Sequence, residues 1–466
     1  MRYISTRGKA PVLNFEEVVL TGLARDGGLY LPESWPQFSK NDIQSLAGMS
    51  YAAAAAFLLQ PFLGDCVDEA DFRKMTEKAY ANFSHKAVVP VSQLGSNEFL
   101  MELYHGPTLA FKDVALQLLG LLYDHLLARE GKRVTIVGAT SGDTGSAAIE
   151  ACRGREAVDI FILHPKGRVS EVQRRQMTTV LDSNVHNIAI EGDFDDCQAM
   201  VKAMFNDHEF RDSLAVSAVN SINWARVMAQ IVYYFTVGVS LGAPSRPISF
   251  SVPSGNFGDV YAGYAASKMG LPVDQLIVAT NRNDILSRFF NSGEYRKSGV
   301  DPTISPSMDI QVSSNFERFL ADLYGRDGDA IADLMSRLDR DGGFSVNMSQ
   351  LNESIFAADR CDEEETLATI RQTLDRSAKL VDPHTAVGLS VGEKCRKHKD
   401  VPLVTLSTAH PAKFPDAVEK ATGERPSLPK HMADLFGRDE RLVDLPNDLE
   451  TVKSFIKERA RILSAA

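Results

Sequence analysis

The chain has 466 residues, of which 44% are hydrophobic and 24% are charged. A chain of this length and composition can bury a large core and is expected to form two or three globular domains. Its 50 lysines and arginines are outnumbered by 61 aspartates and glutamates, which gives a formal net charge of −11. This excess of negative charge repels a phosphate backbone on average and argues against a nucleic-acid partner, while leaving room for pockets that bind small anions.

No segment of the sequence predicts a membrane span, a signal peptide or a metal site. The apolar run 52–59 ends at Gln60 and Pro61 and is far too short to cross a bilayer, and residues 1–7 lack an apolar core. Five singly spaced cysteines fit free thiols in a reducing compartment, and no histidine cluster has metal-ligand spacing. We therefore expect a cytoplasmic protein with no bound metal, no membrane contact and no evident obligate protein partner.

The first part of the chain differs from the remainder. Residues 15–20 and 51–59 have the apolar pattern of helices, and residues 27–32 have that of a short strand. We expect a small, mainly helical amino-terminal domain over residues 1–88.

From about residue 133, short β-rich runs alternate with amphipathic helical patterns. The expected strands are 133–140, 158–164, 185–191, 214–219, 248–253, 276–280 and 401–406, and the expected helices are 170–181, 195–206, 224–239 and 259–269. Apolar strands separated by single helices are typical of α/β proteins with parallel sheets covered by helices on both faces. We expect a large α/β domain, 89–130 and 211–466, with a smaller one, 131–210, inserted in it.

After residue 301 the sequence is less informative. We expect loops at 305–307 and 341–343, a helix over 316–324 and a solvated helix start at 361–365. In α/β folds ligands bind beyond the carboxyl ends of the strands, so the residues just after each strand are the candidates for a site.

Lys112 is the first candidate. In the run 104–113, a turn at Gly106 and Pro107 leads through Thr108, a possible helix cap, into a long apolar helix. A lysine at such a helix start is partly desolvated, which lowers its pKa, and a neutral amine can form a Schiff base with an aldehyde. Pyridoxal phosphate enzymes need this chemistry, although a lysine near a helix start is usually a solvated surface group.

The strand at 133–140 leads into a turn rich in hydroxyl groups. Thr140, Ser141, Asp143 and Thr144 surround Gly142 and open a helix. Hydroxyls and backbone amides at such a position bind a carboxylate or a phosphate, and the alternative is a capped helix start.

The strand at 248–253 leads into Ser254 and a second glycine-rich turn, 255–259. Two glycines flanking an asparagine favour an anion nest suited to a cofactor phosphate, and the alternative is a turn that only lets the helix pack closely. The turn is neither a Walker A motif nor a dinucleotide fingerprint, which argues against nucleoside triphosphates and NAD.

The last expected strand ends at Thr408. A neutral hydroxyl placed against a pyridine nitrogen does not hold the ring protonated, whereas a carboxylate would. His410 and Lys413, just beyond it, have the alternative of capping the strand and the next helix. A reactive lysine, two anion-binding turns and a hydroxyl strand end together favour a pyridoxal phosphate enzyme.

The chain resembles the threonine synthases, members of the fold type II pyridoxal phosphate enzymes, over essentially its whole length. The motifs that carry the resemblance are DGGLYLP at 26–32, HGPTLAFKD at 105–113, ATSGDTG at 139–145, SGNFGD at 254–259 and TAHPAKF at 408–414.

The resemblance implies a role for each motif position. It implies that Lys112 holds pyridoxal phosphate as an internal aldimine and later moves protons. The cofactor would also contact Thr408 at its pyridine nitrogen, Asp143 near its 3-oxygen, and the phosphate-binding turn of Gly255, Asn256, Phe257, Gly258 and Asp259. The substrate carboxylate would lie at Thr140, Ser141 and Thr144.

The run 220–226 resembles the family's site for a substrate phosphate, through Ser221, Asn223 and Arg226. An arginine one helical turn beyond two small polar residues is also a plausible oxyanion clamp on chemical grounds. The alternative is a helix start capped by Ser221 or Asn223, with Arg226 on the solvated face. Trp224 is bulky and is expected to affect the geometry of the clamp.

The activity that the resemblance implies is the conversion of O-phospho-L-homoserine and water to L-threonine and phosphate, the last step of threonine biosynthesis. Two other hypotheses remain open. A dehydratase or β-replacing synthase of the same fold would share Lys112 and the glycine-rich turn without needing Arg226. A scaffold or phosphate sensor that has lost catalysis would not need Lys112.

Overall fold

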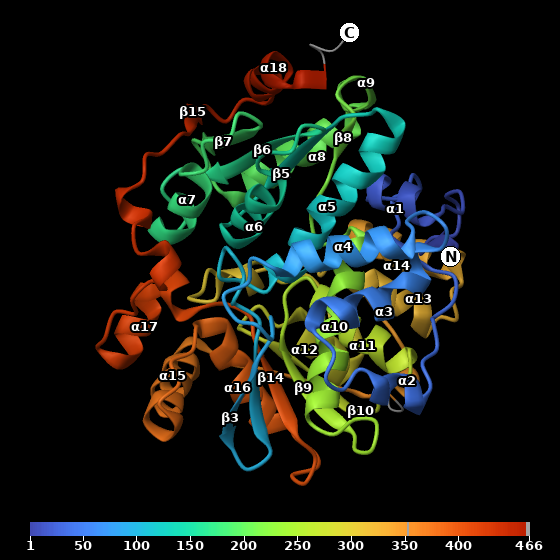
Figure 1. Ribbon diagram of the computed structural model, residues 1–466, viewed down its shortest axis with the longest axis vertical. Coiled ribbons are helices and arrows are strands. Elements are labelled where there is room, and N and C mark those ends of the chain that lie inside the picture. The colour runs from blue at the N-terminus through green and yellow to red at the C-terminus, as the bar shows by residue number, and fades with distance from the viewer. Residues whose placement is uncertain (352–353, 463–466) are drawn as a thin grey trace.

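The computed structural model describes residues 1–351 and 354–462. Two sheets organise the molecule, a smaller one in the upper part of Figure 1 and a larger one in the lower part, with helices around both. Amino-terminal helices, drawn in blue, lie beside the larger sheet, and the carboxyl-terminal segment, drawn in red, runs from the lower part to the top. The expected α/β class, with parallel sheets between helices, is confirmed.

The amino-terminal segment forms a two-stranded antiparallel sheet and four helices. The strands are β1 (Tyr3–Ser5) and β2 (Tyr30–Pro32), and the helices are α1 (Phe15–Thr21), α2 (Lys40–Ser45), α3 (Tyr51–Leu63) and α4 (Glu69–Tyr80). Asn14 and Glu17 form a capping box that starts α1, and Ser50 caps α3. The sequence identified α1 and α3 but placed the end of α3 too early.

Helix α3 continues through Pro61 to Leu63. A proline in the last turn removes one backbone hydrogen bond, but burial of the two residues after it favours the longer helix. Phe62 and Leu63 are fully buried in the main core, together with Tyr3, Phe15 and Trp224. The amino-terminal helices therefore share one hydrophobic core with the rest of the chain.

The larger sheet has six strands in the order β13-β10-β9-β14-β4-β3. They are β3 (Val91–Gly95), β4 (Glu98–Glu102), β9 (Ile248–Pro253), β10 (Val273–Thr280), β13 (Phe356–Arg360) and β14 (Leu403–Ser407). Only the pair of β3 and β4 is antiparallel. Strands β9 and β14 are neighbours, so the turns after them leave the same edge of the sheet.

Alternating side chains of β10 enter two different cores. Leu276 and Val278 belong to the main core, which contains α10 (Trp224–Ser240) and α11 (Gly258–Lys268). Ile277 and Ala279 pack against α16 (Pro383–Cys395) in a separate cluster. Because successive residues of a strand point to opposite faces, this sheet is covered by helices on both faces.

The smaller sheet has five parallel strands in the order β15-β7-β6-β5-β8. They are β5 (Val134–Ala139), β6 (Val158–Pro165), β7 (Val185–Ile190), β8 (Val216–Ser217) and β15 (Val443–Leu445). The accompanying helices are α5 (Lys112–Glu130), α6 (Asp143–Cys152), α7 (Glu171–Thr178), α8 (Phe194–Asn206), α9 (His208–Ser213) and α18 (Leu449–Arg459).

The expected limits of the smaller domain, 131–210, are too narrow. Strand β8 pairs with β5, and β15 pairs with β7, although both lie outside those limits. Helix α18 packs on the same sheet, where Val452 and Ile456 are fully buried. Strand β8 lies within the expected strand 214–219, which the expected limits had placed in the large domain. Strand β15, with only three residues, carries too little periodicity to be recognised in the sequence.

The segment after β10 is more regular than the sequence suggests. It contains α12 (Ile285–Ser292), β11 (Glu294–Arg296), α13 (Phe316–Leu323), α14 (Gly328–Asp341), β12 (Gly343–Ser345), α15 (Glu363–Ser377) and α17 (Pro415–Thr422). Strands β11 and β12 pair with each other. The expected helix at 316–324 and helix start at 361–365 are confirmed, and the loop at 305–307 contains the short 3-10 turn Pro306–Met308. No helix among the described residues is long and apolar enough to cross a membrane.

Candidate active site

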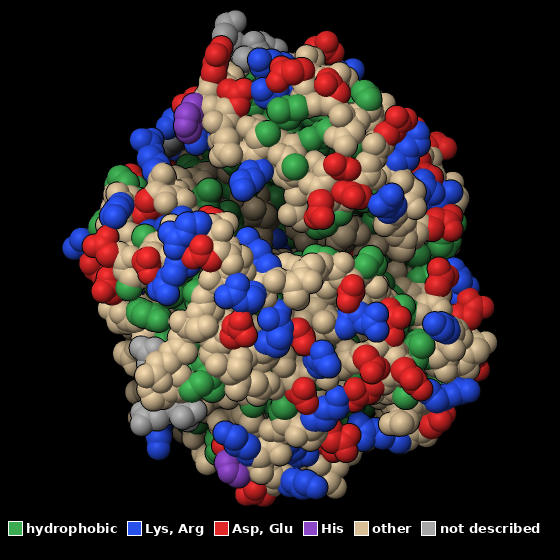
Figure 2. All heavy atoms as spheres, turned by 180° about the vertical axis from the view of Figure 1, so that it is seen from behind, with side chains coloured by type: hydrophobic (Ala, Val, Ile, Leu, Met, Phe, Trp, Pro, Cys, Tyr) green, Lys and Arg blue, Asp and Glu red, His purple; other side chains and the backbone are tan. Residues whose placement is uncertain are grey.

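The segments after β5, β9 and β14 converge between the two sheets. Viewed from behind, the surface is deeply hollowed between the upper and lower parts of the molecule, with Lys and Arg side chains at the edge of the hollow (Figure 2). Contacts of Lys112 and Asp143 join the start of α5 to the turn after β5. These contacts bring the lysine run next to the turn after β5.

Lys112 is the first residue of α5, and backbone bonds fix the run before it. The N–H of Phe111 donates to the carbonyl of Thr408 at 2.8 Å, and the N–H of His410 donates to the carbonyl of Leu109 at 3.0 Å. Leu109 adopts a left-handed backbone conformation, with φ of 64°. The lysine run is thus bonded directly to the hydroxyl strand end.

Thr108 does not cap α5 in the way the sequence suggested. Its hydroxyl and its backbone N–H both donate to the carboxylate of Asp113, at 2.6 and 2.8 Å. Asp113 therefore holds the turn that precedes the helix, and burial raises the pKa of its carboxyl group to about 6. Any side chain at Gly106 would collide with Asp113, because a Cβ there would lie 2.4 Å from its Cβ.

Lys112 is buried, with 7% of its surface exposed. Burial lowers the pKa of its ammonium group, and the nearby cations of Lys413 and Arg226 lower it further. Asp143 opposes the shift, since its Oδ2 lies 3.3 Å from Lys112 Nζ. The net direction favours the neutral amine that Schiff-base chemistry requires.

Lys413 is the main partner of Asp143. Its Nζ lies 2.8 Å from Asp143 Oδ1 and donates to the carbonyl of Thr108 at 2.8 Å, and the side chain is fully buried. Gln173 also donates to Asp143 Oδ1, at 2.9 Å. Burial alone would raise the pKa of Asp143, but the two lysines hold it well below its usual value.

The sequence had left the role of Lys413 open. A lysine inside the mainly apolar run 408–414, just after a buried strand, was the only available signal. His410, by contrast, does cap the short turn after β14, because its Nδ1 accepts the N–H of Ala412 at 3.1 Å.

The turn after β9 has unused hydrogen-bond donors. No hydrogen bond among the described residues uses the backbone N–H groups of Gly255, Asn256, Phe257 or Gly258. The hydroxyl of Ser254 is buried and likewise has no partner there. Converging free donors at the start of a helix suit a phosphate group.

Phe257 and Asp259 anchor this turn to the protein interior. Phe257 has φ of 60°, and its ring packs into an aromatic cluster with Phe316 at a centroid distance of 5.3 Å. Asp259 accepts hydroxyl hydrogen bonds from Tyr233 and Tyr234, at 2.5 and 3.0 Å. Burial raises the pKa of Asp259 to about 6. The backbone of Phe257 can face a phosphate while its side chain anchors the turn.

In the turn after β5, the three hydroxyl residues have different environments. Thr140 is buried, and its Oγ1 accepts the N–H groups of Gly142 and Gly145 at 2.9 and 2.8 Å. Ser141 and Thr144 are partly exposed, and no hydrogen bond among the described residues uses their hydroxyls. Thr140 therefore has the structural role of capping the start of α6, whereas the hydroxyls of Ser141 and Thr144 remain free to bind a ligand.

Arg226 lies inside the protein rather than on a solvated face. Its side chain is 4% exposed, its Nη1 donates to the carbonyl of Val219 at 3.1 Å, and its Nε has no partner. No carboxylate among the described residues forms an ion pair with it. Burial lowers the pKa of this guanidinium to about 10, which measures how poorly its charge is compensated.

Asn223 and Trp224 have structural contacts. Asn223 caps α10 by accepting the N–H of Ala225 at 3.0 Å, and its amide donates to the carbonyl of Val19 at 2.9 Å. Trp224 packs on Tyr3 and Phe62 at centroid distances of 6.1 and 5.7 Å. The cap by Asn223 is the one that the alternative interpretation of this run described, and the Trp224 indole belongs to the aromatic core.

The segment 305–315 contributes to the site, although no role was expected for it. Ser313 donates to the carbonyl of Gly255 at 2.6 Å, and the N–H of Asn315 donates to the carbonyl of Asn256 at 3.0 Å. Asn315 also donates to the carbonyl of Ser221 at 2.9 Å. This segment joins the turn after β9 to the run that precedes Arg226, and its serine and asparagine content was the only sequence signal.

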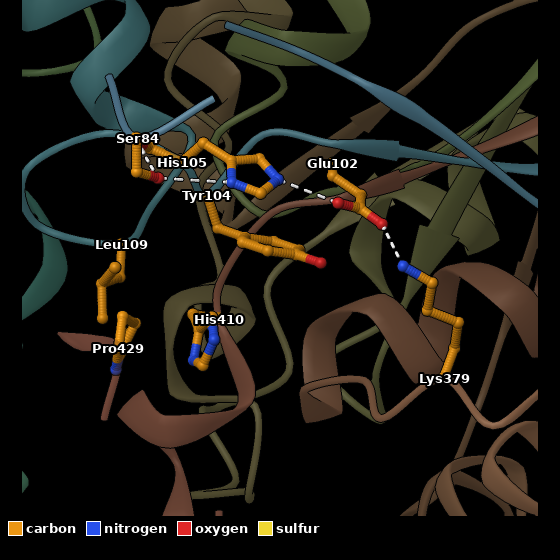
Figure 3. Close-up of a pocket in the computed structure, with 8 residues that line it drawn as sticks. All are labelled: Ser84, Glu102, Tyr104, His105, Leu109, Lys379, His410 and Pro429. Atoms are coloured by element: carbon orange, nitrogen blue, oxygen red, sulfur yellow. Dashed lines mark hydrogen bonds and ion pairs between the residues drawn. The ribbon is translucent and has the colours of Figure 1, made fainter. Parts of the chain in front are cut away.

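A cavity of about 340 Å³ lies beside the run 104–109 (Figure 3). Glu102 accepts from His105 Nε2 at 2.8 Å and from Lys379 Nζ at 2.7 Å, and it also bonds Ser92. Burial alone would raise the pKa of Glu102, but these donors lower it to about 2. The carboxylate therefore anchors the run that leads to Lys112.

A buried lysine with a lowered pKa and a turn of free backbone amides, placed between two mainly parallel sheets, are the features of a pyridoxal-phosphate-dependent enzyme of fold type II. The family model "Pyridoxal-phosphate dependent enzyme" matches residues 86–406, and pyridoxal phosphate is the cofactor. The models "Threonine synthase N terminus" and "Threonine synthase, C-terminal" match residues 2–80 and 385–456. The chain belongs to the threonine synthase family.

Individual relatives agree with this assignment. A protein named threonine synthase from Pseudomonas aeruginosa is 57% identical over 461 residues, which cover 98% of each chain. The solved structure of a PLP-bound threonine synthase from Brucella melitensis is 55% identical, with a TM-score of 0.97 over 99% of this chain and 100% of that one. The yeast threonine synthase structure is 40% identical, with a TM-score of 0.93 over 100% and 99% of the two chains.

Proposed function

We propose that the protein converts O-phospho-L-homoserine and water to L-threonine and phosphate, as the last step of threonine biosynthesis. The observation that carries this proposal is the buried guanidinium of Arg226, which has no carboxylate partner among the described residues. A buried charge of this kind is costly unless an anion compensates it. The names of the relatives support the same reaction.

Two anions must be bound by different groups. We assign the cofactor phosphate to the free amides of Gly255, Asn256, Phe257 and Gly258, and the substrate phosphate to Arg226 and Ser221. The charge of Arg226 lowers the pKa of Lys112, which indicates that the guanidinium lies near this amine. Ser141 and Thr144, whose hydroxyls are open, would take the substrate carboxylate. Thr140 and Asn223 would shape these two sites through their own hydrogen bonds.

Pyridoxal phosphate supplies an electron sink that stabilises negative charge next to the amino-bearing carbon of the substrate. Lys112 would hold the cofactor through its amine, and the same amine in its neutral form would be the base that takes the α proton of the substrate. Asp143 is held ionised by Lys413 and steers the Lys112 amine. Thr408 would face the pyridine nitrogen, and Asp143 would lie near the 3-oxygen of the ring.

Binding energy from the substrate phosphate would position the leaving group. A charge-assisted clamp on a phosphate contributes roughly a few kcal/mol, which a substrate without phosphate cannot use. Retained phosphate could also remain at Arg226 while water adds to the β carbon. A dehydratase or β-replacing synthase has no use for such a clamp, and a scaffold has no use for a lysine with a lowered pKa.

The test is substrate profiling of the cofactor-loaded enzyme. We expect phosphate release and threonine formation from O-phospho-L-homoserine, and neither from O-phospho-L-serine. Release from phosphoserine with pyruvate formation would replace this proposal with a dehydratase. A protein that shows no absorbance of lysine-bound cofactor would support the scaffold hypothesis.

We also propose a cytoplasmic location. All five cysteines are free thiols in the structure, which fits a reducing compartment. Fractionation of cells that express the protein with an epitope tag tests this placement.

A further inference from the structure

Asp382 and His384, at the start of α16, are hydrogen-bonded to each other. The second ring nitrogen of His384 faces the segment 305–315, next to the candidate site. Asp382 is fully buried and caps α16 by accepting the N–H groups of His384 and Thr385 at 3.0 and 3.1 Å. Asp382 Oδ2 also lies 2.7 Å from His384 Nδ1. The imidazole is 3% exposed and packs on the ring of Phe414.

The other nitrogen of this imidazole accepts a hydrogen bond from the segment 305–315. The backbone N–H of Ser307 donates to His384 Nε2 at 3.2 Å. Because a backbone N–H can only donate, Nε2 carries no proton, and the proton of the neutral ring lies on Nδ1, facing Asp382. The cap of α16 uses only the Asp382 carboxylate and backbone N–H groups, so it does not explain why the imidazole of His384 contacts Ser307.

Ser307 connects this pair to Lys112 through Asp143. Its hydroxyl donates to Asp143 Oδ2 at 3.3 Å, and Lys112 Nζ contacts the same oxygen at 3.3 Å. Lys413 contacts the other oxygen, Oδ1, at 2.8 Å. The hydroxyl and the Lys112 amine therefore compete for one oxygen.

The position of Ser307 is fixed from a second side. A Cβ at Gly255 would lie 2.7 Å from the carbonyl of Ser307, so this segment lies directly on the phosphate-binding turn. The charged groups that face Lys112 come from four elements: Asp143 on α6, Arg226 on α10, Asp259 on α11 and Lys413 after β14. Ser307 is the neutral donor in this group.

We propose that Ser307 is a positioning residue for Lys112, and that the Asp382 and His384 pair holds it in place. By donating to Asp143 Oδ2, the Ser307 hydroxyl weakens the hold of that oxygen on the lysine, so that the amine loses its proton more readily. The proposal rests on the role of Lys112 as the cofactor lysine and proton carrier. It does not depend on which substrate the enzyme uses.

The test measures the chemical reactivity of Lys112 in the cofactor-free protein. Acetic anhydride labelling at a series of pH values, read by mass spectrometry of the Lys112 peptide, gives the midpoint at which the amine becomes neutral. The exposed Lys86 serves as an internal standard. We expect Ser307→Ala to raise the midpoint by about 0.5 pH unit, a roughly threefold loss of reactivity below the midpoint.

Variants of His384 distinguish positioning from a general structural role. His384→Leu removes the acceptor and should reproduce the Ser307→Ala shift, whereas His384→Gln offers an amide oxygen to the Ser307 N–H and should restore the midpoint. Thr303→Val is the matched control, because it removes a hydroxyl just before the segment 305–315, one that bonds Asp309 instead of Asp143. It should leave the midpoint unchanged.

An unchanged midpoint in Ser307→Ala would overturn the proposal, and so would a shift in Ser307→Ala that His384→Leu does not share. If His384→Leu fails to fold, His384→Gln against the wild type and Ser307→Ala still decide the case. No substrate is present in the labelling, so failure of the proposed reaction would leave these results intact. Failure of the midpoint shift would, in turn, leave the substrate assignment untouched.

Discussion

Replacing Arg226 with methionine should raise the free energy of unfolding and abolish the proposed binding of the substrate phosphate. Burial lowers the pKa of Arg226 from its ordinary value to about 10. A difference of about 2.5 pH units corresponds to about 3 kcal/mol of destabilisation by the charged form at neutral pH. Arg226→Met removes this cost and keeps similar volume, but it leaves the carbonyl of Val219 without its donor, a loss of about 1 kcal/mol.

The net expectation for Arg226→Met is a gain of about 2 kcal/mol in the free energy of unfolding of the cofactor-loaded protein. Urea unfolding at neutral pH measures it, with Arg25→Met, the loss of an exposed arginine, as the control. Inorganic phosphate added at about a hundred times its dissociation constant should stabilise the wild type by about 3 kcal/mol and the Arg226 variant hardly at all.

Two results would refute this reasoning. A loss of stability in Arg226→Met in the absence of phosphate would mean that the guanidinium is already well compensated in the folded protein. Equal stabilisation of the two proteins by phosphate would place the substrate anion elsewhere. Cofactor absorbance should be normal in both proteins, because the turn at 255–258 is proposed to bind the cofactor phosphate.

Four further substitutions test the other assignments. Lys112→Ala should abolish turnover and the absorbance of lysine-bound cofactor without unfolding the protein, and residual activity above a trace would exclude Lys112. Thr408→Asp should protonate the pyridine nitrogen and increase transamination relative to threonine formation, and unchanged product ratios would exclude Thr408 as its partner. Lys413→Met should raise the pKa of Lys112 by about 1 pH unit, seen as a higher pH midpoint for cofactor binding, because a like charge is removed. Glu102→Gln should lower the free energy of unfolding by roughly 2 kcal/mol above pH 5. The difference from wild type should vanish as the pH falls from 4.5 to about 2, because the native carboxylate takes up its proton over this range. Acid titration of both proteins, followed by circular dichroism, checks this.

The sequence predicted elements with strong periodicity and sites with distinctive composition. Helices α8 and α10 were placed to within a residue or two at each end, because their apolar faces recur every three to four residues. The lysine run and the two glycine-rich turns were chosen as candidates because glycine next to hydroxyl groups at a helix start can bind an anion.

The features that the sequence missed depend on contacts between distant segments. Lys413 looks like any lysine until the fold places it 2.8 Å from Asp143, 270 positions earlier in the chain. Ser307 gives no signal, because its partners, Asp143 and His384, lie far away on both sides. The burial of Arg226 was not predictable either, since a helix start with one arginine is compatible with both a solvated and a buried face.

The position of β15 affects how the protein is made. Strand β7 ends at Ile190, but its parallel neighbour β15 begins only at Val443. At a synthesis rate of about 5–20 residues per second, the ribosome needs roughly 10–50 s to supply that neighbour. During this interval β7 is an unpaired edge, and Val452 and Ile456 are not yet there to cover the sheet face of Phe161 and Ile188. A nascent chain stalled before residue 443 should therefore bind chaperones and aggregate, even though every residue proposed to contact the cofactor has already been made.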